Sequence, residues 1–387
     1  MRVAGTNIVF LSAGFLFSLY AYLLHQIDGE VKRSILINAG FSFVAFLITF
    51  VMIPVVCPYL IHRWRLFGFD INKFGTPRGN IRIPEALGIV VGIVFLAVVW
   101  LFQHLYIANS TWLYWVALIP ICLMILLGFV DDVWEVRWRV KLVFSFMAAF
   151  ALLLAYYTYV GHTTIIVPKP LVPHVGLEFL DLGWVYYLYM CLLAVFCTNS
   201  INIHAGINGL EVGQTVVIAS AILIHNIMRI GASTGNVEYQ YAHVFSIHLV
   251  QPLLATSLAL LSYNWYPSSV FVGDTYTYFA GMTLVVVGII SHSSEILICF
   301  FAPQIINFIM SLRQLVGIIP CPRHRLPKFD PQTGLLTGTE DGTLVNFCLR
   351  RFGRMSEQSL CIVLLSLQAI ACGFGFFLWW LLAGWYK

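Results

Sequence analysis

The sequence of 387 residues contains little charge. Only 10% of its residues are Asp, Glu, Lys or Arg, whereas soluble domains carry about 25%. So few charges cannot cover a surface that faces water, and the chain is 60% hydrophobic with a mean hydropathy of +0.87. This composition excludes an ordinary soluble protein. It indicates a protein with several membrane-spanning helices, because only structures that satisfy their own backbone hydrogen bonds can cross a bilayer.

The small net charge and the lack of paired cysteines each exclude a class of function. Lys and Arg exceed Asp and Glu by a formal net charge of only +4, which does not indicate binding to nucleic acid. Nine cysteines are present without any Cys-x-x-Cys pair, and most lie in apolar stretches. This placement is typical of small buried side chains rather than of metal ligands or disulfides.

Eleven apolar stretches are long enough to predict spanning helices. They cover residues 7–24, 36–58, 87–106, 113–130, 141–160, 184–200, 212–230, 246–263, 275–291, 296–318 and 357–382. The first is long for the apolar core of a signal peptide, and no cleavage pattern follows it, so we expect a retained helix. The fold class expected is therefore an all-α polytopic membrane protein.

Lys and Arg are distributed unequally when the loops alternate across the membrane. One side collects the loops 59–86, 131–141, 200–212, 264–275 and 319–356. These loops hold fourteen Lys and Arg residues, against five on the other side. Because cytosolic loops are enriched in Lys and Arg, the first set is predicted to be cytosolic.

The densest charge in the chain lies in one junction between two apolar stretches, residues 126–141 (LLGFVDDVWEVRWRVK). Asp131 and Asp132 end the first stretch, and Lys141 begins the second. One aspartate could cap the following helix, since Asp is a preferred N-cap, but that does not explain both. The functional interpretation is a carboxylate pair near a divalent cation and phosphates.

Two other predicted cytosolic helix ends carry amide and acidic side chains. Residues 199–209 (NSINIHAGING) supply three asparagines and two glycines, which offer oxygen ligands, amide donors and close ligand approach. His204 within this segment is expected to pack or to line the site rather than to bind a metal. Asp274 stands alone between two apolar stretches, where an acid is costly and usually functional, although an N-cap is the alternative.

A fourth predicted cytosolic segment, residues 320–327 (PCPRHRLP), places two arginines between prolines. Prolines disfavour a helix and favour extended backbone, in which Arg323 and Arg325 share a face. Two converging guanidinium groups suit a diphosphate, whereas anchoring to lipid headgroups needs no fixed geometry. Acids, amides and arginines on one face of a helical bundle together indicate Mg²⁺-dependent phosphoryl transfer.

The chain resembles the polyprenyl-phosphate N-acetylhexosamine-1-phosphate transferases, a glycosyltransferase 4 type family. The matching segments are LGFVDDVWEVRWRVK, TTIIVPKP, AVFCTNSINIHAGINGLEVGQ, NWYPSSVFVGDTYTYFAGMT and IIPCPRHRLPK. TTIIVPKP and PCPRHR are typical of the eukaryotic branch. The resemblance implies a ten-helix core whose site faces the cytosol of the endoplasmic reticulum. Residues 1–30 would add one helix in front of a single phosphotransferase domain, residues 31–387.

The eukaryotic branch implies an activity and its partners. N-acetylglucosamine-1-phosphate would pass from UDP-N-acetylglucosamine to dolichyl phosphate, as the first step of lipid-linked oligosaccharide synthesis for N-glycosylation. The resemblance also implies Mg²⁺ as cofactor, the lipid bilayer as surroundings and tunicamycin as inhibitor. A homodimer is compatible with the sequence, which does not define the oligomeric state.

The resemblance also implies roles for individual residues. Asn202 and Asp274 match the Mg²⁺ ligands. Asp131, Asp132 and Lys141 match an acidic pair and its lysine, which either deprotonate or orient the acceptor. Arg323, His324 and Arg325 match the loop that holds the pyrophosphate and the sugar, and Gly206, Asn208 and Phe271 match positions around the uracil. Glu85 matches a polar contact on the first cytosolic loop, and Asn199 matches a further asparagine of the site. The chain departs from the family at Glu135 and Val140, where members often have Asn and His.

Three rival interpretations differ in testable ways. A transporter would place ionisable groups near the midplane, often in two related halves, whereas here the acids lie at helix ends and no internal repeat is evident. The same chemistry could use a bacterial lipid or another UDP-sugar. A non-catalytic subunit is the third, although each of the motifs is present.

Overall fold

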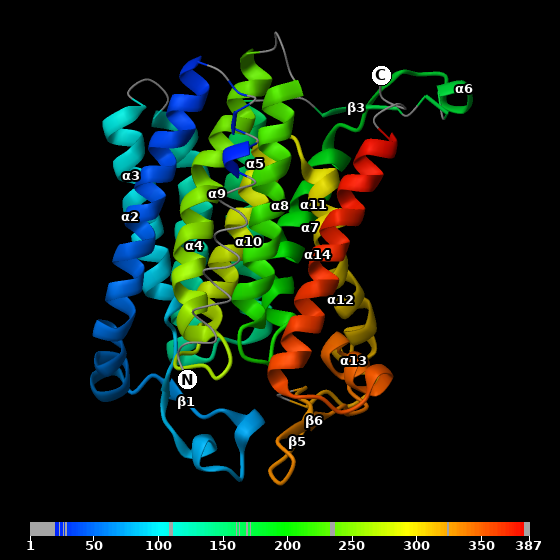
Figure 1. Cartoon of the computed structure of the whole chain (residues 1–387). Coiled ribbons are helices and arrows are strands. Elements are labelled where there is room, and N and C mark those ends of the chain that lie inside the picture. Colours follow the sequence, from blue (N-terminus) through cyan, green and yellow to red (C-terminus); the bar gives the residue numbers. More distant parts are fainter. Residues whose placement is uncertain are drawn as a thin grey trace.

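The computed structural model describes residues 20–22, 24, 25, 27, 29–107, 111–159, 161, 163–167, 169, 170, 172–232, 237–322 and 325–382. Within these residues the chain forms a bundle of long, roughly parallel helices (Figure 1). The long helices are α2 (Gly29–Tyr59), α3 (Gly88–Tyr106), α4 (Thr111–Trp134), α5 (Trp138–Tyr159), α7 (Trp184–Ile203), α8 (Leu210–Ala232), α9 (Val237–Asn264), α10 (Gly273–Ile290) and α14 (Glu357–Leu382).

Nine helices in the described part of the chain are long and apolar enough to cross a membrane. The number rises to ten if α11 (Ser294–Phe300) and α12 (Ala302–Leu315) form one bent span. The prediction of a helical polytopic membrane protein is therefore confirmed. Most of the first predicted span, 7–24, lies outside the described residues.

The two largest departures from the predicted spans concern the stretches 296–318 and 246–263. The stretch 296–318 bends by 65° between α11 and α12. Pro303 is the second residue of α12, and proline lacks an N–H and crowds the preceding turn, so it interrupts a helix. Helix α9 begins at Val237 rather than near residue 246, because its polar first turns continue the same helix.

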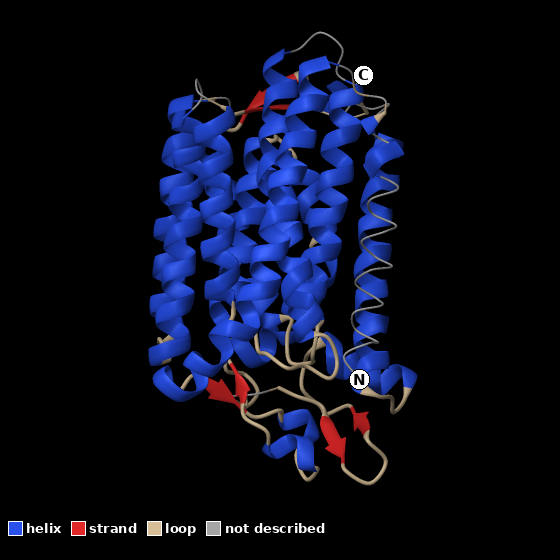
Figure 2. Ribbon diagram, turned by 60° about the vertical axis from the view of Figure 1, so that its left-hand side comes forward, coloured by secondary structure: helices blue, strands red, loops and turns tan. Residues whose placement is uncertain are grey.

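Short elements cover the two ends of the bundle (Figures 1 and 2). One end, called here the site end, carries the β1–β2 ribbon, the β5–β6 ribbon and α13 (Leu344–Phe352). The opposite end carries the β3–β4 ribbon and α6 (Val172–Val175). The ribbons are antiparallel pairs of Phe67–Gly68 with Ile83–Pro84, Thr164–Ile166 with Phe179–Asp181, and Lys328–Asp330 with Leu335–Thr337.

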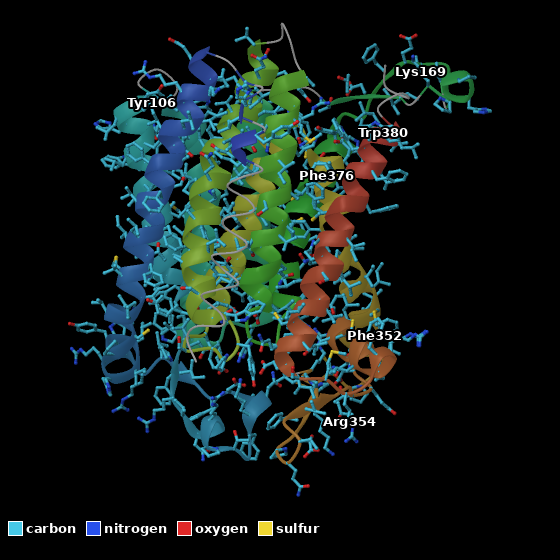
Figure 3. The ribbon with its side chains drawn as sticks, viewed as in Figure 1. Tyr106, Lys169, Phe352, Arg354, Phe376 and Trp380 are labelled. Atoms are coloured by element: carbon cyan, nitrogen blue, oxygen red, sulfur yellow. The ribbon has the colours of Figure 1, made fainter. Side chains whose placement is uncertain are left out.

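The segment between α2 and α3 lies at the site end. It contains a π-helix, Leu60–Trp64, and two 3₁₀ helices, Ile71–Lys73 and Pro77–Asn80. Figure 3 shows Phe352 and Arg354 at this end, whereas Tyr106, Lys169 and Trp380 lie toward the opposite end. Large apolar side chains such as Phe43 and Val51 of α2 are exposed on the flank of the bundle, as expected for a surface that contacts lipid.

Helix α10 occupies the centre of the bundle, and nearly all of its residues are buried. Its neighbours approach closely where glycines leave room. Gly88 of α3 lies against the backbone of Tyr276, and Gly128 of α4 lies against the backbone of Thr275. Gly281 of α10 in turn meets the backbone of Cys197 on α7. These contacts bring the site-end termini of four helices together.

We expect Gly128→Ala to destabilise the protein by about 1–3 kcal/mol, the usual cost of overpacking a well-packed core. The new Cβ would lie 2.7 Å from the carbonyl oxygen of Asp274 and closer still to the Thr275 backbone. Helices α4 and α10 would have to separate at the site. Thermal unfolding of the purified protein in detergent measures the effect. Gly373→Ala in α14 is the matched control, since its Cβ meets no atom within 4 Å. Equal unfolding temperatures for the two variants would contradict the close approach.

Candidate active site

The C-terminal end of α4 meets the N-terminal end of α10 through Asp132. Its Oδ1 accepts a hydrogen bond from the backbone N–H of Asp274 at 2.6 Å. Its Oδ2 accepts from the N–H and the hydroxyl of Thr275, at 3.1 and 2.5 Å. The first N–H groups of a helix lack partners within the helix. Asp132 therefore caps α10 from a different part of the chain.

This result corrects two interpretations of the sequence. Asp132 does not cap the helix that follows it, α5, but one that begins more than a hundred residues later. The alternative interpretation of Asp274 as an N-cap is also wrong, because Asp274 lies inside α10 and its carboxylate accepts from side chains. Gly273 adopts φ +74°, and a Cβ there would overlap the Asp132 carboxylate. This turn therefore requires glycine.

Lys141 lies between two carboxylates. Its Nζ pairs with Oδ2 of Asp131 and lies 3.2 Å from Oδ2 of Asp274. The other oxygen of Asp131 accepts the backbone N–H of Val136 at 2.8 Å, which closes the turn between α4 and α5. The hydroxyl of Tyr278 lies 3.4 Å from Asp131 Oδ2. The Lys141 ammonium group, near the start of α5, thus links the C-terminal end of α4 to the N-terminal end of α10.

The asparagines of α7 have different neighbours. The amide nitrogen of Asn202 donates to Asp274 Oδ1 and, at 3.1 Å, to the hydroxyl of Thr277. Asn199, one turn earlier, donates to the carbonyl of Val195 at 2.8 Å and to Ser145 at 3.3 Å. Asn202 therefore belongs to the same contact group as Asp131, Lys141 and Asp274, whereas Asn199 lies beside it against α5.

Glu85 and Phe271 meet at the β1–β2 ribbon. The N–H of Phe271 donates to the carbonyl of Pro84 at 2.8 Å, so the loop before α10 extends the ribbon. A Cβ on Gly68 would lie 3.2 Å from the ring of Phe271 and 3.6 Å from the carboxylate of Glu85. Burial raises the pKa of Glu85, and the negative charges of Asp274 and Glu135 raise it further. The carboxylates of Asp274 and Glu135 therefore lie near enough to Glu85 to raise its pKa.

The turn after α7 is held by polar contacts to distant segments. Gly206 has φ +106°, its N–H donates to Glu211 at 3.1 Å, and its carbonyl accepts from the side chain of Asn72 at 2.8 Å. His204 is buried, and burial lowers its pKa to about 4, so it is neutral at physiological pH. Its carbonyl accepts from Gln214 at 2.9 Å. The expectation that His204 packs agrees with these contacts.

A buried ionic cluster lies beside this turn, and the sequence interpretation missed it. Lys73 pairs with Asp70 and, at 3.1 Å, with Glu357 at the start of α14. All three residues are at least 94% buried. Burial lowers the pKa of Lys73, but the charges of Glu357 and Asp70 outweigh it and leave that pKa raised. The available signal was an acid and a lysine three residues apart, in a chain that has few charges.

Asn208 connects this cluster to the turn. Its backbone N–H donates to Glu357 Oε1 at 2.8 Å, and its side-chain amide donates to Asp70 Oδ2 at 3.0 Å. Loop 59–86, turn 204–209 and the first residue of α14 thus form one packed unit. Helix α14 begins where the predicted span 357–382 begins.

Only one residue of the Arg-His-Arg segment lies within the described part of the chain. Arg323 and His324 lie outside it, so the convergence of Arg323 with Arg325 stays a prediction. Residues 325–327 have neither helical nor strand structure. The buried Nη1 of Arg325 has no hydrogen-bond partner among the described residues. Leu326 packs against Gly206, which places this segment beside turn 204–209.

Glu135 lies in the turn between α4 and α5 and adopts φ +50°. This left-handed conformation is uncommon for residues with a side chain, and Asn tolerates it better than Glu does. The backbone therefore gives a physical reason for the Asn that the resemblance implies at this position.

The fold and this geometry define a class of protein: a multi-span helical membrane protein with acidic, amide and basic side chains gathered at one end of its bundle.

The family model described as Glycosyl transferase family 4 matches residues 114–292. A UDP-N-acetylglucosamine--dolichyl-phosphate N-acetylglucosaminephosphotransferase of Dictyostelium discoideum is 47% identical over 92% of this chain and 91% of its own length. Proteins of the same name from Schizosaccharomyces pombe and Saccharomyces cerevisiae are 34% and 33% identical, each over 92% of this chain. These matches cover 94% and 93% of the two yeast proteins. The chain belongs to the glycosyltransferase 4 family and, within it, to the group of these phosphotransferases.

Proposed function

We propose that this protein transfers N-acetylglucosamine-1-phosphate from UDP-N-acetylglucosamine to dolichyl phosphate. The products are dolichyl diphosphate N-acetylglucosamine and UMP. The observation that carries the proposal is the junction of α4, α5, α7 and α10, where Lys141 lies between Asp131 and Asp274, and Asn202 contacts Asp274. The names of the three relatives supply the substrates.

A bound Mg²⁺ suits the donors of this junction. Mg²⁺ prefers oxygen ligands, and it is often held by one or two protein groups together with waters and substrate phosphates. The Asp274 carboxylate and the amide oxygen of Asn202 are such groups, once the Asn202 amide is turned to present its oxygen. No cluster of three or more His, Cys, Asp or Glu suited to a metal occurs among the described residues. When bound, Mg²⁺ would neutralise charge on the diphosphate.

The reaction needs no strong base. A phosphate monoester has a second pKa of about 6 and is mostly ionised at neutral pH. A phosphate oxygen of dolichyl phosphate attacks the β-phosphorus of the nucleotide sugar. The bond between the β-phosphorus and the oxygen that it shares with the α-phosphorus breaks, and UMP leaves with that oxygen. The bond between the sugar and its phosphate is untouched, so the anomeric configuration is retained.

Asp131 and Asp132 then act mainly by positioning. Asp132 uses both oxygens to hold the start of α10, and Asp131 uses its oxygens to hold Lys141 and the α4–α5 turn. Lys141 is the group that we assign to the acceptor phosphate, because its ammonium is a compact charge at the junction.

The nucleotide sugar would extend from this junction toward turn 204–209. Gly206, Asn208 and Phe271 are assigned to the uracil base, and Glu85 and Asn199 to polar contacts nearby. Arg325 is assigned to the diphosphate and sugar together with Arg323 and His324. The buried Nη1 of Arg325 has no partner among the described residues, which supports this assignment, because buried donors normally have partners.

We infer that the site end faces the cytosol of the endoplasmic reticulum. Loops rich in Lys and Arg lie at this end of the bundle, and such loops are usually cytosolic. The names of the relatives place them in dolichol chemistry. The extra N-terminal helix and a homodimer stay predictions.

The proposal is tested by measuring transfer of radiolabel from UDP-N-acetylglucosamine to dolichyl phosphate with the purified protein. We expect one UMP for each labelled lipid, loss of transfer on chelation of Mg²⁺, and inhibition by tunicamycin. Parallel reactions with undecaprenyl phosphate and with other UDP-sugars test the rival substrates. Absence of transfer from UDP-N-acetylglucosamine to dolichyl phosphate would overturn the proposal, and transfer that survives chelation would remove Mg²⁺ from it.

A further inference from the structure

Asp70 has the contacts of a fixed hydrogen-bond acceptor. Its Oδ1 accepts the backbone N–H of Asn72 at 3.1 Å, which caps the 3₁₀ helix Ile71–Lys73. Its Oδ2 accepts from Lys73 and, at 3.0 Å, from the side-chain amide of Asn208. The side chain is 5% exposed. Every described partner of this carboxylate is therefore a donor, and the group is held in place from three sides.

This arrangement determines which way the Asn208 amide faces. An ionised carboxylate can only accept hydrogen bonds, so it must face the NH₂ group of the amide and not its oxygen. Turning the amide over would bring its oxygen against the Asp70 oxygen. None of the described residues donates to Asn208 Oδ1, whereas Nδ2 is bound to Asp70. The oxygen of Asn208 is thus the acceptor left for a ligand.

The backbone of Asn208 is fixed by the same cluster. Its N–H donates to Glu357 Oε1 at 2.8 Å, and Glu357 Oε2 accepts from Lys73 at 3.1 Å. Asn72 reaches the carbonyl of Gly206 at 2.8 Å. Both the position of residue 208 and the orientation of its side chain are set before any ligand arrives.

We propose that Asp70, through the orientation that it imposes on the Asn208 amide, makes the protein select uracil over cytosine. The inference rests on the proposed function, which places Asn208 beside the base of the nucleotide. Asp70 itself is a specificity-determining positioning residue and need not touch the base.

The chemistry of the two bases gives the reason. Uracil carries a donor at N3 and an acceptor at O4, whereas cytosine carries an acceptor at N3 and a donor at N4. An amide offers one acceptor and one donor side by side, and turning it over exchanges them. An amide free to turn can pair with either base. An amide held by Asp70 keeps its oxygen and its NH₂ group in one order. That order matches the donor at N3 and the acceptor at O4 of uracil, and it does not match cytosine.

Asp70→Asn tests the inference, because it keeps the shape of the side chain and lets it donate as well as accept. Turning of the Asn208 amide is then no longer opposed. The readout is the ratio of the inhibition constants of CDP and UDP against transfer from UDP-N-acetylglucosamine. We expect the wild-type protein to prefer UDP, and the variant to lose about tenfold or more of that preference, since a matched pair of hydrogen bonds discriminates between bases by about that factor. The ratio is measured within each preparation, so partial loss of folded protein does not affect it.

Two further variants separate specificity from general damage to the cluster. Glu357→Gln changes the contacts of Lys73 and of the Asn208 backbone but leaves Asp70 beside the amide. It should weaken UDP and CDP by the same factor. In an Asn208→Ala background, Asp70→Asn should cause no further change in the ratio, because coupled residues are not additive.

The outcomes distinguish this inference from the proposed function. If the wild-type protein transfers sugar phosphate and Asp70→Asn keeps its ratio, the inference fails and the proposed function stands. A wild-type protein that binds UDP and CDP equally, or an Asp70→Asn effect that persists without Asn208, also overturns the inference. A wild-type protein that transfers nothing from UDP-N-acetylglucosamine overturns both.

Discussion

Asp274→Asn should lower Mg²⁺-dependent release of UMP by about 100- to 1,000-fold, the range seen when one group that stabilises charge in a transition state is removed. Asp274 contacts Lys141 at 3.2 Å and accepts from Asn202. It is also the acidic residue that we assign to Mg²⁺. The substitution removes a full negative charge, yet it preserves the size of the side chain and the cap that Asp132 provides to the backbone. UMP release by the purified variant, titrated with Mg²⁺, measures the effect.

Glu340→Gln is the matched control for this experiment. It also removes one carboxylate at the site end, but Glu340 is exposed on the loop before α13. We expect it to keep wild-type turnover. Wild-type turnover of Asp274→Asn at every Mg²⁺ concentration would remove Asp274 from the metal site and from the reaction.

Asp132→Ala should lower transfer by about 100-fold and also destabilise the protein by about 1–3 kcal/mol. The loss of stability follows because two N–H groups at the start of α10 lose their acceptor. The loss of transfer follows because the backbone of Asp274 is then no longer held, and displacement of a reacting group by about 1 Å can cost 100-fold. Thermal unfolding and radiolabel transfer on the same preparation measure the two effects.

Two milder variants distinguish a capping role for Asp132 from a role as base. Asp132→Asn keeps one acceptor oxygen, so it should retain part of both stability and activity. Thr275→Val removes only the hydroxyl that donates to Asp132 Oδ2, and we expect its activity to exceed that of Asp132→Ala. If Asp132→Asn were as inactive as Asp132→Ala but fully stable, Asp132 would act as a base instead.

The class of the protein and the composition of its site follow from local features of the chain. A stretch of about 20 apolar residues must form a helix in a bilayer wherever it lies, so most spans could be located without knowledge of their neighbours. Where an observed helix differs from the predicted span, the cause is local as well, such as Pro303 at the bend between α11 and α12. The alternation of loops likewise assigned Asp131, Asn202 and Asp274 to one end of the bundle.

Pairing between distant residues could not be predicted in this way. Asp132 lies beside Asp131 in the sequence, yet the two carboxylates have different partners. Asp132 caps the start of α10, whereas Asp131 pairs with Lys141. Successive helical residues point about 100° apart, and only the packing of α4 on α10 decides what each one meets. Gly128 permits that packing because its missing side chain lets two backbones touch.

What the sequence alone determined is therefore the membrane fold, the family, and the end of the bundle that carries the chemistry. Each depends on composition, periodicity or a continuous motif. Only the tertiary structure assigned Asp132 to the start of α10, and only it joined Asp70, Lys73, Asn208 and Glu357 into one buried cluster. The physical reason is that a buried charge is tolerated only with partners, and here the partners come from segments far apart in the chain.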